Sequence, residues 1–252
     1  MSISVSFKNE LFSLDKLNLP TRYYYFNESE NYIKLLNIGE GIFPKDKIKT
    51  VLKLENSNAI VTTESATKVY PSKNEKSGVG INSINVDLKN SNLEFINDEL
   101  ILFNQAKFIQ VLKIKADDTS TFFYGDILSH GRSYENFDFS LMAAKNSFFV
   151  DNSIEYLEKY ALQGESLKKY VNDFRSKKNL FAKVYIKLQN NGAFLEKLND
   201  VNITSFSYTS NKKMIIGVVS GDNMAILKKQ LLDIWSLYRK CLDKKVFLLG
   251  KQ

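Results

Sequence analysis

The sequence predicts a mainly β fold with stacked β-layers, solenoid-like or sandwich-like, together with a long C-terminal α-helix and one or two short helices. Short runs rich in β-branched residues, separated by Asn, Ser, Gly and Asp turns, dominate residues 50–150. Within them a strand–turn–strand unit recurs after 34 residues, because Val51–Ala59 resembles Asn85–Leu93. Such recurrence is typical of stacked β-layers, although chance similarity is an alternative in a chain rich in asparagine.

The first half of the chain contains most of the expected strands. Residues 3–7 alternate as an opening strand, and the aromatic cluster Tyr23–Phe26 is expected to pack internally, with a base-stacking platform as the alternative. Further strands are expected at Val51–Leu54, Ala59–Tyr70, Ile84–Leu88, Leu93–Phe95, Leu100–Leu112, Thr121–Leu128 and Phe137–Met142.

The last third mixes strands and helices. Strands are expected at Phe181–Leu188, Ile203–Tyr208 and Met214–Val219, and a short helix at Glu165–Arg175. A long helix begins near Asp222, which is a suitable N-cap. Its apolar residues follow a three-or-four spacing and predict a stripe that covers one face of a sheet, or alternatively binds a partner: Met224, Leu227, Leu231, Ile234, Trp235, Tyr238 and Leu242.

Composition indicates one soluble globular domain spanning residues 1–252. The chain is 44% hydrophobic, and its three prolines and eleven glycines form no obvious linker. No apolar run is long enough to span a bilayer, and the N-terminus lacks the pattern of a signal peptide. The single cysteine, Cys241, cannot form an internal disulfide. A cytoplasmic protein without membrane attachment is therefore expected.

The net charge of +7 makes a basic, β-rich nucleic-acid-binding module the main alternative function. Nearly all of the positive charge is lysine, however, and arginine, the residue that makes bidentate phosphate and guanine contacts, is scarce. Lysine clusters such as Lys45, Lys47 and Lys49 are more typical of a solvated surface. We therefore do not expect a nucleic-acid partner.

The expected strand at Val61–Tyr70 has an unusual composition. Strand alternation places Thr63, Ser65, Thr67 and Val69 on one face. A buried hydroxyl needs a hydrogen-bond partner, so this face is either exposed to solvent or lines a hydrated interior.

The same stretch carries a family resemblance. Thr62-Thr63-Glu64-Ser65-Ala66-Thr67-Lys68-Val69-Tyr70 resembles the signature of the UreD (UreH) urease accessory proteins, which usually have Gln where this chain has Glu64. Asp46 matches an aspartate of the family, but Pro44 and Lys45 replace the two glycines that usually precede it. The resemblance continues from about residue 38 to 243, at Leu93–Ile96, Ile101–Phe103 with Ala106, Tyr124–Ile127, Gly131-Arg132, and Trp235 with Arg239.

The resemblance implies a protein that is not an enzyme. UreD-like proteins bind the urease apoprotein and UreF, which recruits the GTPase UreG, and the assembly delivers nickel to urease. They are mainly β, and a water-filled tunnel is their proposed nickel path. In this chain, the resemblance suggests that Asp46, Thr63, Ser65, Thr67, Asp126 and Asp151 line such a path.

The residue chemistry agrees with passage of a metal. The chain lacks both phosphate-binding glycine motifs, and its only histidine is His130. A hydrolase using Asp126 and His130 is a third alternative. With one histidine and one cysteine, a tight nickel or zinc site is not expected, and no cofactor should be firmly bound. Oxygen ligands remain, which bind such metals weakly, so nickel is expected only in transit.

Overall fold

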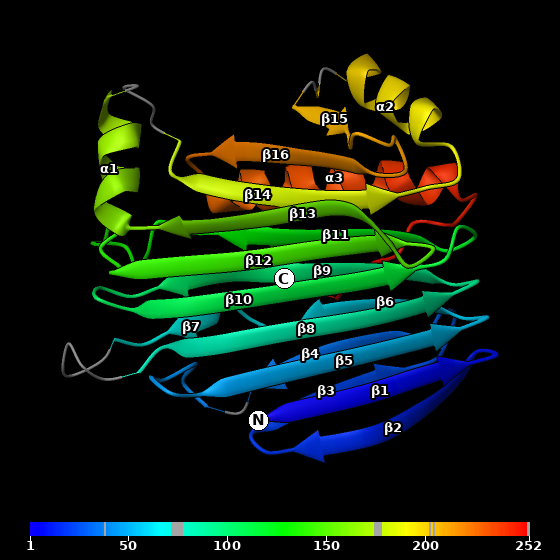
Figure 1. Cartoon of the computed structure of the whole chain (residues 1–252), viewed down its shortest axis with the longest axis horizontal. Helices are drawn as coiled ribbons and strands as arrows, with labels where there is room; N and C mark the ends of the chain where they lie inside the picture. Colours follow the sequence, from blue (N-terminus) through cyan, green and yellow to red (C-terminus); the bar gives the residue numbers. More distant parts are fainter. Residues whose placement is uncertain (38, 72–77, 174–177, 202, 204, 251–252) are drawn as a thin grey trace.

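Two β-sheets and three helices make up the described part of the chain (Figure 1). This computed structural model describes residues 1–37, 39–71, 78–173, 178–201, 203 and 205–250. Sheet A has the strand order β13 (Ser153–Leu162), β12 (Leu141–Val150), β10 (Lys107–Ala116), β8 (Gly80–Lys89), β5 (Lys47–Glu55), β1 (Ser2–Lys8) and β2 (Leu11–Asn18).

Sheet B lies behind sheet A in Figure 1. Its strand order is β15 (Phe206–Tyr208), β16 (Ile215–Gly221), β14 (Leu180–Lys187), β11 (Thr121–Leu128), β9 (Asn92–Leu102), β6 (Asn58–Thr63), β4 (Tyr32–Asn37) and β3 (Thr21–Phe26), and β7 (Thr67–Val69) also pairs with β9. The helices are α1 (Gly164–Asp173), α2 (Asn191–Asp200) and α3 (Met224–Cys241).

The central strands form a two-layer solenoid. The chain runs along sheet A in β5, β8 and β10 and returns each time along sheet B in β6, β9 and β11. Successive strands within each sheet therefore pair in parallel, with Val51 beside Asn85 in sheet A and Ala59 beside Leu93 in sheet B. The repeat of 34 residues predicted from the sequence is one rung of this solenoid, so the predicted stacked β-layers are confirmed.

The turns between the two sheets explain the repeated Asn-Ser-Asn sequence. Asn9, Asn56 and Asn90 have positive φ angles of 49°, 50° and 46°, a conformation that asparagine tolerates better than most residues. Their side chains form a ladder, in which Asn90 Nδ2 donates to Asn56 Oδ1 at 2.9 Å and Asn56 Nδ2 donates to Asn9 Oδ1 at 3.1 Å. Beside this ladder, the Ser57 backbone amide donates to Ser91 Oγ at 3.1 Å. The turn residues thus set the register of the rungs.

The long C-terminal helix covers the outer face of sheet B. Its predicted apolar stripe is buried there at Leu227, Leu231, Ile234, Trp235 and Tyr238, so the covering role is confirmed. The N-cap is Asn223 and not Asp222, because the Asn223 side chain accepts from the Ile226 backbone amide at 3.1 Å. No described helix covers the outer face of sheet A (Figure 1).

The predicted strand Ala59–Tyr70 is wrong as a single element. It consists of β6 and β7, separated by residues 64–66. Side-chain hydroxyls interrupt the ladder at this point, since Thr62 Oγ1 donates to the Ile96 carbonyl and Thr63 Oγ1 accepts from the Asp98 amide, both at 2.7 Å. The predicted alternation of Thr63, Ser65 and Thr67 on one strand face therefore does not hold.

Other boundaries also need correction. The break predicted between Leu93–Phe95 and Leu100–Leu112 is absent, because β9 continues from Asn92 to Leu102 and the chain turns at residues 103–106 instead. The strand predicted at Phe137–Met142 begins only at Leu141. Strands β2, β3, β4 and β13 and helix α2 were not predicted. Arg175 of the predicted short helix and residue 204 of the predicted strand at Ile203–Tyr208 lie outside the described residues.

Candidate functional site

Two adjoining pockets lie between the sheets. They have volumes of about 300 and 340 Å³ and share the lining residues Thr67, Asn82, Ile84 and Asn97. We call the two together the internal passage. Besides the shared residues, its first pocket is lined by Gln110, Tyr124, Asp126, Tyr160, Lys183 and Tyr185 among others, and its second by Thr21, Gly39, Glu40, Gly41, Thr63, Ser65, Ala66 and Lys68 among others.

Strand register brings polar side chains into this passage. In sheet A, Asn82 of β8 lies beside Gln110 of β10, and both line the first pocket. In sheet B, the pairing of β9 with β11 shifts register between Gly125 and Ile127, where Asn97 and Asp126 come together. A β-bulge redirects side chains in this way. The polar residues of the two sheets therefore meet inside the solenoid.

Asp126 is a carboxylate that lines the first pocket, as Asp98 also does. Its Oδ1 accepts from Asn97 Nδ2 and its Oδ2 accepts from Gln110 Nε2, both at 2.6 Å. Burial raises the pKa of Asp126 to about 6, although these amide donors and the charge of Lys183 act in the opposite direction. Asp126 therefore changes charge just below neutral pH.

A second carboxylate, Glu158, lies near Asp126, and its negative charge is balanced by an ion pair with Lys183. Glu158 accepts from Lys183 Nζ at 2.7 Å, from the Tyr185 hydroxyl at 2.6 Å and from Asn146 Nδ2 at 3.0 Å. Burial alone would raise the pKa of Glu158, but the hydrogen bonds from Lys183 and Tyr185 lower it below its usual value. Glu158 thus stays ionised beside a lysine, whereas the charge of Asp126 changes just below neutral pH.

The stability of an Asp126→Asn variant should depend on pH in a defined direction. Because the folded-state pKa of about 6 exceeds the ordinary 3.8, the contribution of Asp126 to stability is full below 3.8 and is lost as the pH rises through 6. The variant has no carboxyl group at this position, so it does not lose this stability as the pH rises. Its stability relative to the wild type should therefore rise by about 1–3 kcal/mol from mildly acidic to neutral pH.

Urea unfolding at pH values below, near and above 6 measures this difference. Asp222→Asn, at an exposed aspartate, is the matched control and should show no such trend. A stability difference for Asp126→Asn that stays constant across this range would contradict the assigned titration.

The residues predicted for the metal path divide into two groups. Thr63, Ser65 and Thr67 line the second pocket, Thr67 also lines the first, and Asp126 lines the first. Asp46 and Asp151 line neither pocket. Asp46 Oδ2 accepts from the Phe43 amide at 2.8 Å, and partly exposed Asp151 accepts from the Asp118 amide at 2.9 Å.

The remaining residues of the family signature have structural contacts. Tyr70 stacks on Phe43 with ring centroids 4.7 Å apart, and Glu64 pairs with Lys34 at 3.2 Å. Gly131 has a φ of 124°, which favours glycine, and Arg132 pairs with Glu135 at 2.6 Å. These contacts hold the loops that flank the pockets.

Four neutral amides of the passage were missed from the sequence: Asn82, Asn97, Gln110 and Asn146. Two of them occupy inward-pointing strand positions with apolar neighbours on both sides, Gln110 between Phe108 and Leu112 and Asn146 between Ala144 and Phe148. An amide at the inward-pointing position of a strand whose other inward-pointing residues are apolar was the available sequence signal.

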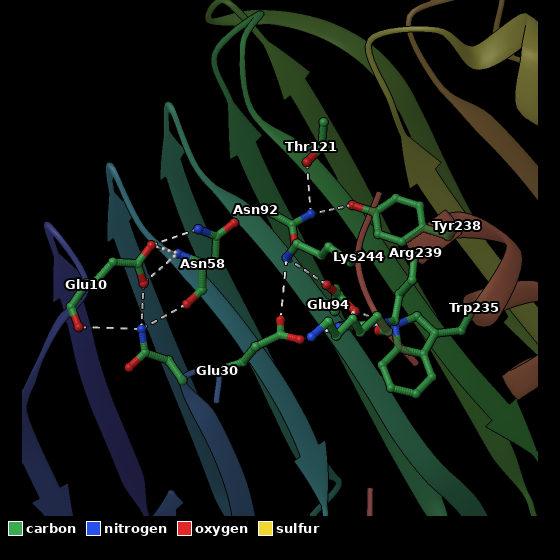
Figure 2. Close-up of polar contacts among 12 residues, drawn as sticks. Glu10, Glu30, Asn58, Asn92, Glu94, Thr121, Trp235, Tyr238, Arg239 and Lys244 are labelled. Carbon is green, nitrogen blue, oxygen red and sulfur yellow. Dashed lines mark hydrogen bonds and ion pairs between the residues drawn. The ribbon is translucent and has the colours of Figure 1, made fainter. Parts of the chain in front are cut away.

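A buried ionic network fixes α3 and the following segment to sheet B (Figure 2). Glu94 of β9 is fully buried, and its Oε2 accepts from Trp235 Nε1 and from Arg239 Nη1, both at 2.6 Å. Lys244 Nζ donates to Glu94 Oε1 at 3.0 Å, and Arg239 also pairs with Glu30. Trp235 and Arg239, which carry the helical part of the resemblance, thus hold the helix in place.

Comparison with known proteins identifies the family. The chain matches the family model described as UreD urease accessory protein over residues 18–248. The chain belongs to the UreD family. It is 60% identical over 253 residues to the urease accessory protein UreD of Aliarcobacter butzleri, which covers all of both chains. It is also 26% identical over 211 residues to UreD of Streptococcus thermophilus, covering 78% of this chain and 75% of that protein.

The UreD membership supports a urease accessory role and urease-related partners. Within the part of the chain that the structure describes, no three His, Cys, Asp or Glu side chains gather as a metal site would require. Among the same residues, the helices are all too short or too polar to cross a membrane.

Proposed function

We propose that this UreD-family chain is a urease maturation chaperone that passes nickel through its internal passage. In this proposal the chain works in the cytoplasm, binds the urease apoprotein and UreF, and reaches UreG through UreF. It catalyses no reaction itself. The two adjoining pockets between the sheets, whose lining includes hydroxyls, amides and the Asp126 carboxylate among apolar side chains, are the single observation that carries the proposal.

The lining chemistry suits a divalent ion in transit. Thr63, Ser65 and Thr67 contribute hydroxyl oxygens, Asn97 contributes an amide, and Asp126 contributes a negative charge. Oxygen ligands of this kind bind nickel more weakly than imidazole or thiolate, so the ion exchanges rapidly. In the proposal, the Asp126 carboxylate lowers the energy of the cation without trapping it.

The charges around Asp126 in the first pocket are also placed suitably. Lys183 would repel a cation, but its ammonium lies 2.7 Å from Glu158 and is largely neutralised there. Asp126 accepts hydrogen bonds from the neutral amides of Asn97 and Gln110. The proposal therefore assigns Thr63, Ser65, Thr67 and Asp126 to the nickel path, whereas Asp46 and Asp151 lie outside it.

Reconstitution of urease tests the function. Urease subunits, UreF and UreG are expressed in a host with and without this chain, and urease is then purified for nickel analysis and activity. We expect most of the bound nickel and of the activity to depend on this chain, and we expect the chain to copurify with the urease apoprotein. Equal nickel content in the two preparations at limiting nickel would overturn the proposed function.

A further inference from the structure

The outer face of sheet A concentrates positive charge. Strand alternation and register place on it the lysines Lys8, Lys16, Lys47, Lys49, Lys53, Lys89, Lys107, Lys113, Lys115, Lys145 and Lys159, against the acids Asp15, Glu55 and Asp87. We call this surface the lysine face. Figure 1 views the molecule from this side, where no helix crosses the sheet.

Much of this charge is not compensated within the chain. Lys49, Lys113 and Lys145 make no ion pair with any residue that the structure describes, whereas Lys8 pairs with Glu55 at 3.0 Å. Lys145 of β12 lies directly opposite Lys159 of β13. Like charges in directly opposed positions destabilise a sheet, so the arrangement costs stability in the isolated chain. An acidic surface placed against this face would remove that cost.

Apolar side chains separate the lysines. Ile81, Ile109 and Val111 are partly exposed on the same face, and Lys113 lies over the ring of Phe149 at 5.2 Å. A broad sheet with aliphatic patches between charges can bury apolar area against another protein. The described arginines lie elsewhere, at Arg22, Arg132 and Arg239, so the residue that best recognises phosphate and guanine is missing from this face. These features favour a protein over a nucleic acid.

We propose that the lysine face docks an acidic surface of the urease apoprotein. This inference rests on the proposed function, which supplies the apoprotein as a partner, and adds the surface and the charge that this partner must present. Complementary charge should speed association and make it sensitive to salt, and the aliphatic residues between the lysines should contribute the buried contact.

Charge reversal on the full-length chain tests the docking face. The test variant is Lys49→Glu/Lys113→Glu/Lys145→Glu, and the control variant Lys169→Glu/Lys212→Glu/Lys229→Glu changes net charge equally at exposed positions elsewhere. Binding to purified urease apoprotein, to UreF and to duplex DNA is measured at low and moderate salt, after circular dichroism shows that both variants are folded. We expect the test variant to bind apoprotein roughly tenfold or more weakly. The control variant should bind like the wild type.

The outcomes separate the inference from the function on which it rests. Unchanged apoprotein binding by the test variant overturns the docking face, while the proposed function stands. Loss of UreF binding alone, or salt-dependent DNA binding that only the test variant loses, also overturns it by assigning the face to another partner. A wild-type chain that binds no apoprotein at all overturns the proposed function and the inference together.

Discussion

Replacing Glu94 by alanine should lower the free energy of unfolding by about 3–5 kcal/mol, the largest stability change we expect from a single side chain. Glu94 has no exposed surface and Arg239 is only 1% exposed, so removal of the carboxylate leaves a buried guanidinium facing a cavity. The Trp235 indole and Lys244 lose the same acceptor. Arg239 keeps Glu30 as its remaining carboxylate partner, but losing a buried ion-pair partner is far more costly than losing an exposed one.

Chemical unfolding followed by far-ultraviolet circular dichroism measures this change. Glu196→Ala, at an exposed glutamate on α2, is the matched control and should change stability by less than about 0.5 kcal/mol. Because the network joins α3 to sheet B, proteolysis of Glu94→Ala should begin in the C-terminal region. Equal unfolding midpoints for the two variants would contradict the role assigned to Glu94.

The parts of the fold that the sequence predicted are those set by local patterns. The Asn-Ser-Asn repeat predicted the repeating rung of the solenoid, because Asn56 and Asn90 occupy equivalent left-handed turn positions. The apolar stripe from Leu227 to Tyr238 predicted a helix packed on a sheet, since the buried residues follow the helical period. Both patterns can be recognised from residues that are close in sequence or separated by one repeat length.

The strand boundaries that were predicted wrongly depend on contacts between segments that are far apart in the sequence. The strand is interrupted between Thr63 and Thr67 because the Thr62 hydroxyl donates to the Ile96 carbonyl. The secondary-structure propensities of residues 64–66 do not reveal this contact. Similarly, the polar run Asn97-Asp98-Glu99 indicated a turn, but Lys228 of α3 pairs with Asp98 and Glu99 at 3.3 and 2.6 Å. Such pairing keeps a polar segment inside a strand.

The candidate site was predictable only in part. Thr63, Ser65, Thr67 and Asp126 stood out through the family signature and their chemistry, and all of them line the internal passage. Gln110 could be noticed as an amide between apolar strand neighbours, but Asn97 could be recognised only once strand register placed it on Asp126. The partner of either amide depends on the neighbour that the fold supplies.

Filling the passage should produce the largest functional loss. Asn82 is the best position for this, because it lines both pockets and projects from sheet A toward the opposite sheet. An Asn82→Phe variant places a ring where the two pockets meet, and close packing of the surrounding side chains leaves the ring little freedom to move aside. Nickel loading of urease should then fall by an order of magnitude, at a cost in stability of about 1–3 kcal/mol.

Two further variants make this result specific. Asn82→Ala removes the amide but leaves the space open, and should retain most of the nickel loading. Asn199→Phe introduces the same ring at an exposed position of α2 and should behave like the wild type. All three variants should still copurify with the urease apoprotein, which separates a blocked passage from a lost partner.

The most direct measurement is therefore the nickel content of urease purified together with Asn82→Phe at limiting nickel. If nickel travels through the interior of this chain, the apoprotein complex forms normally and its urease remains nearly free of nickel. Urease that carries as much nickel with Asn82→Phe as with Asn199→Phe would contradict transport through the passage.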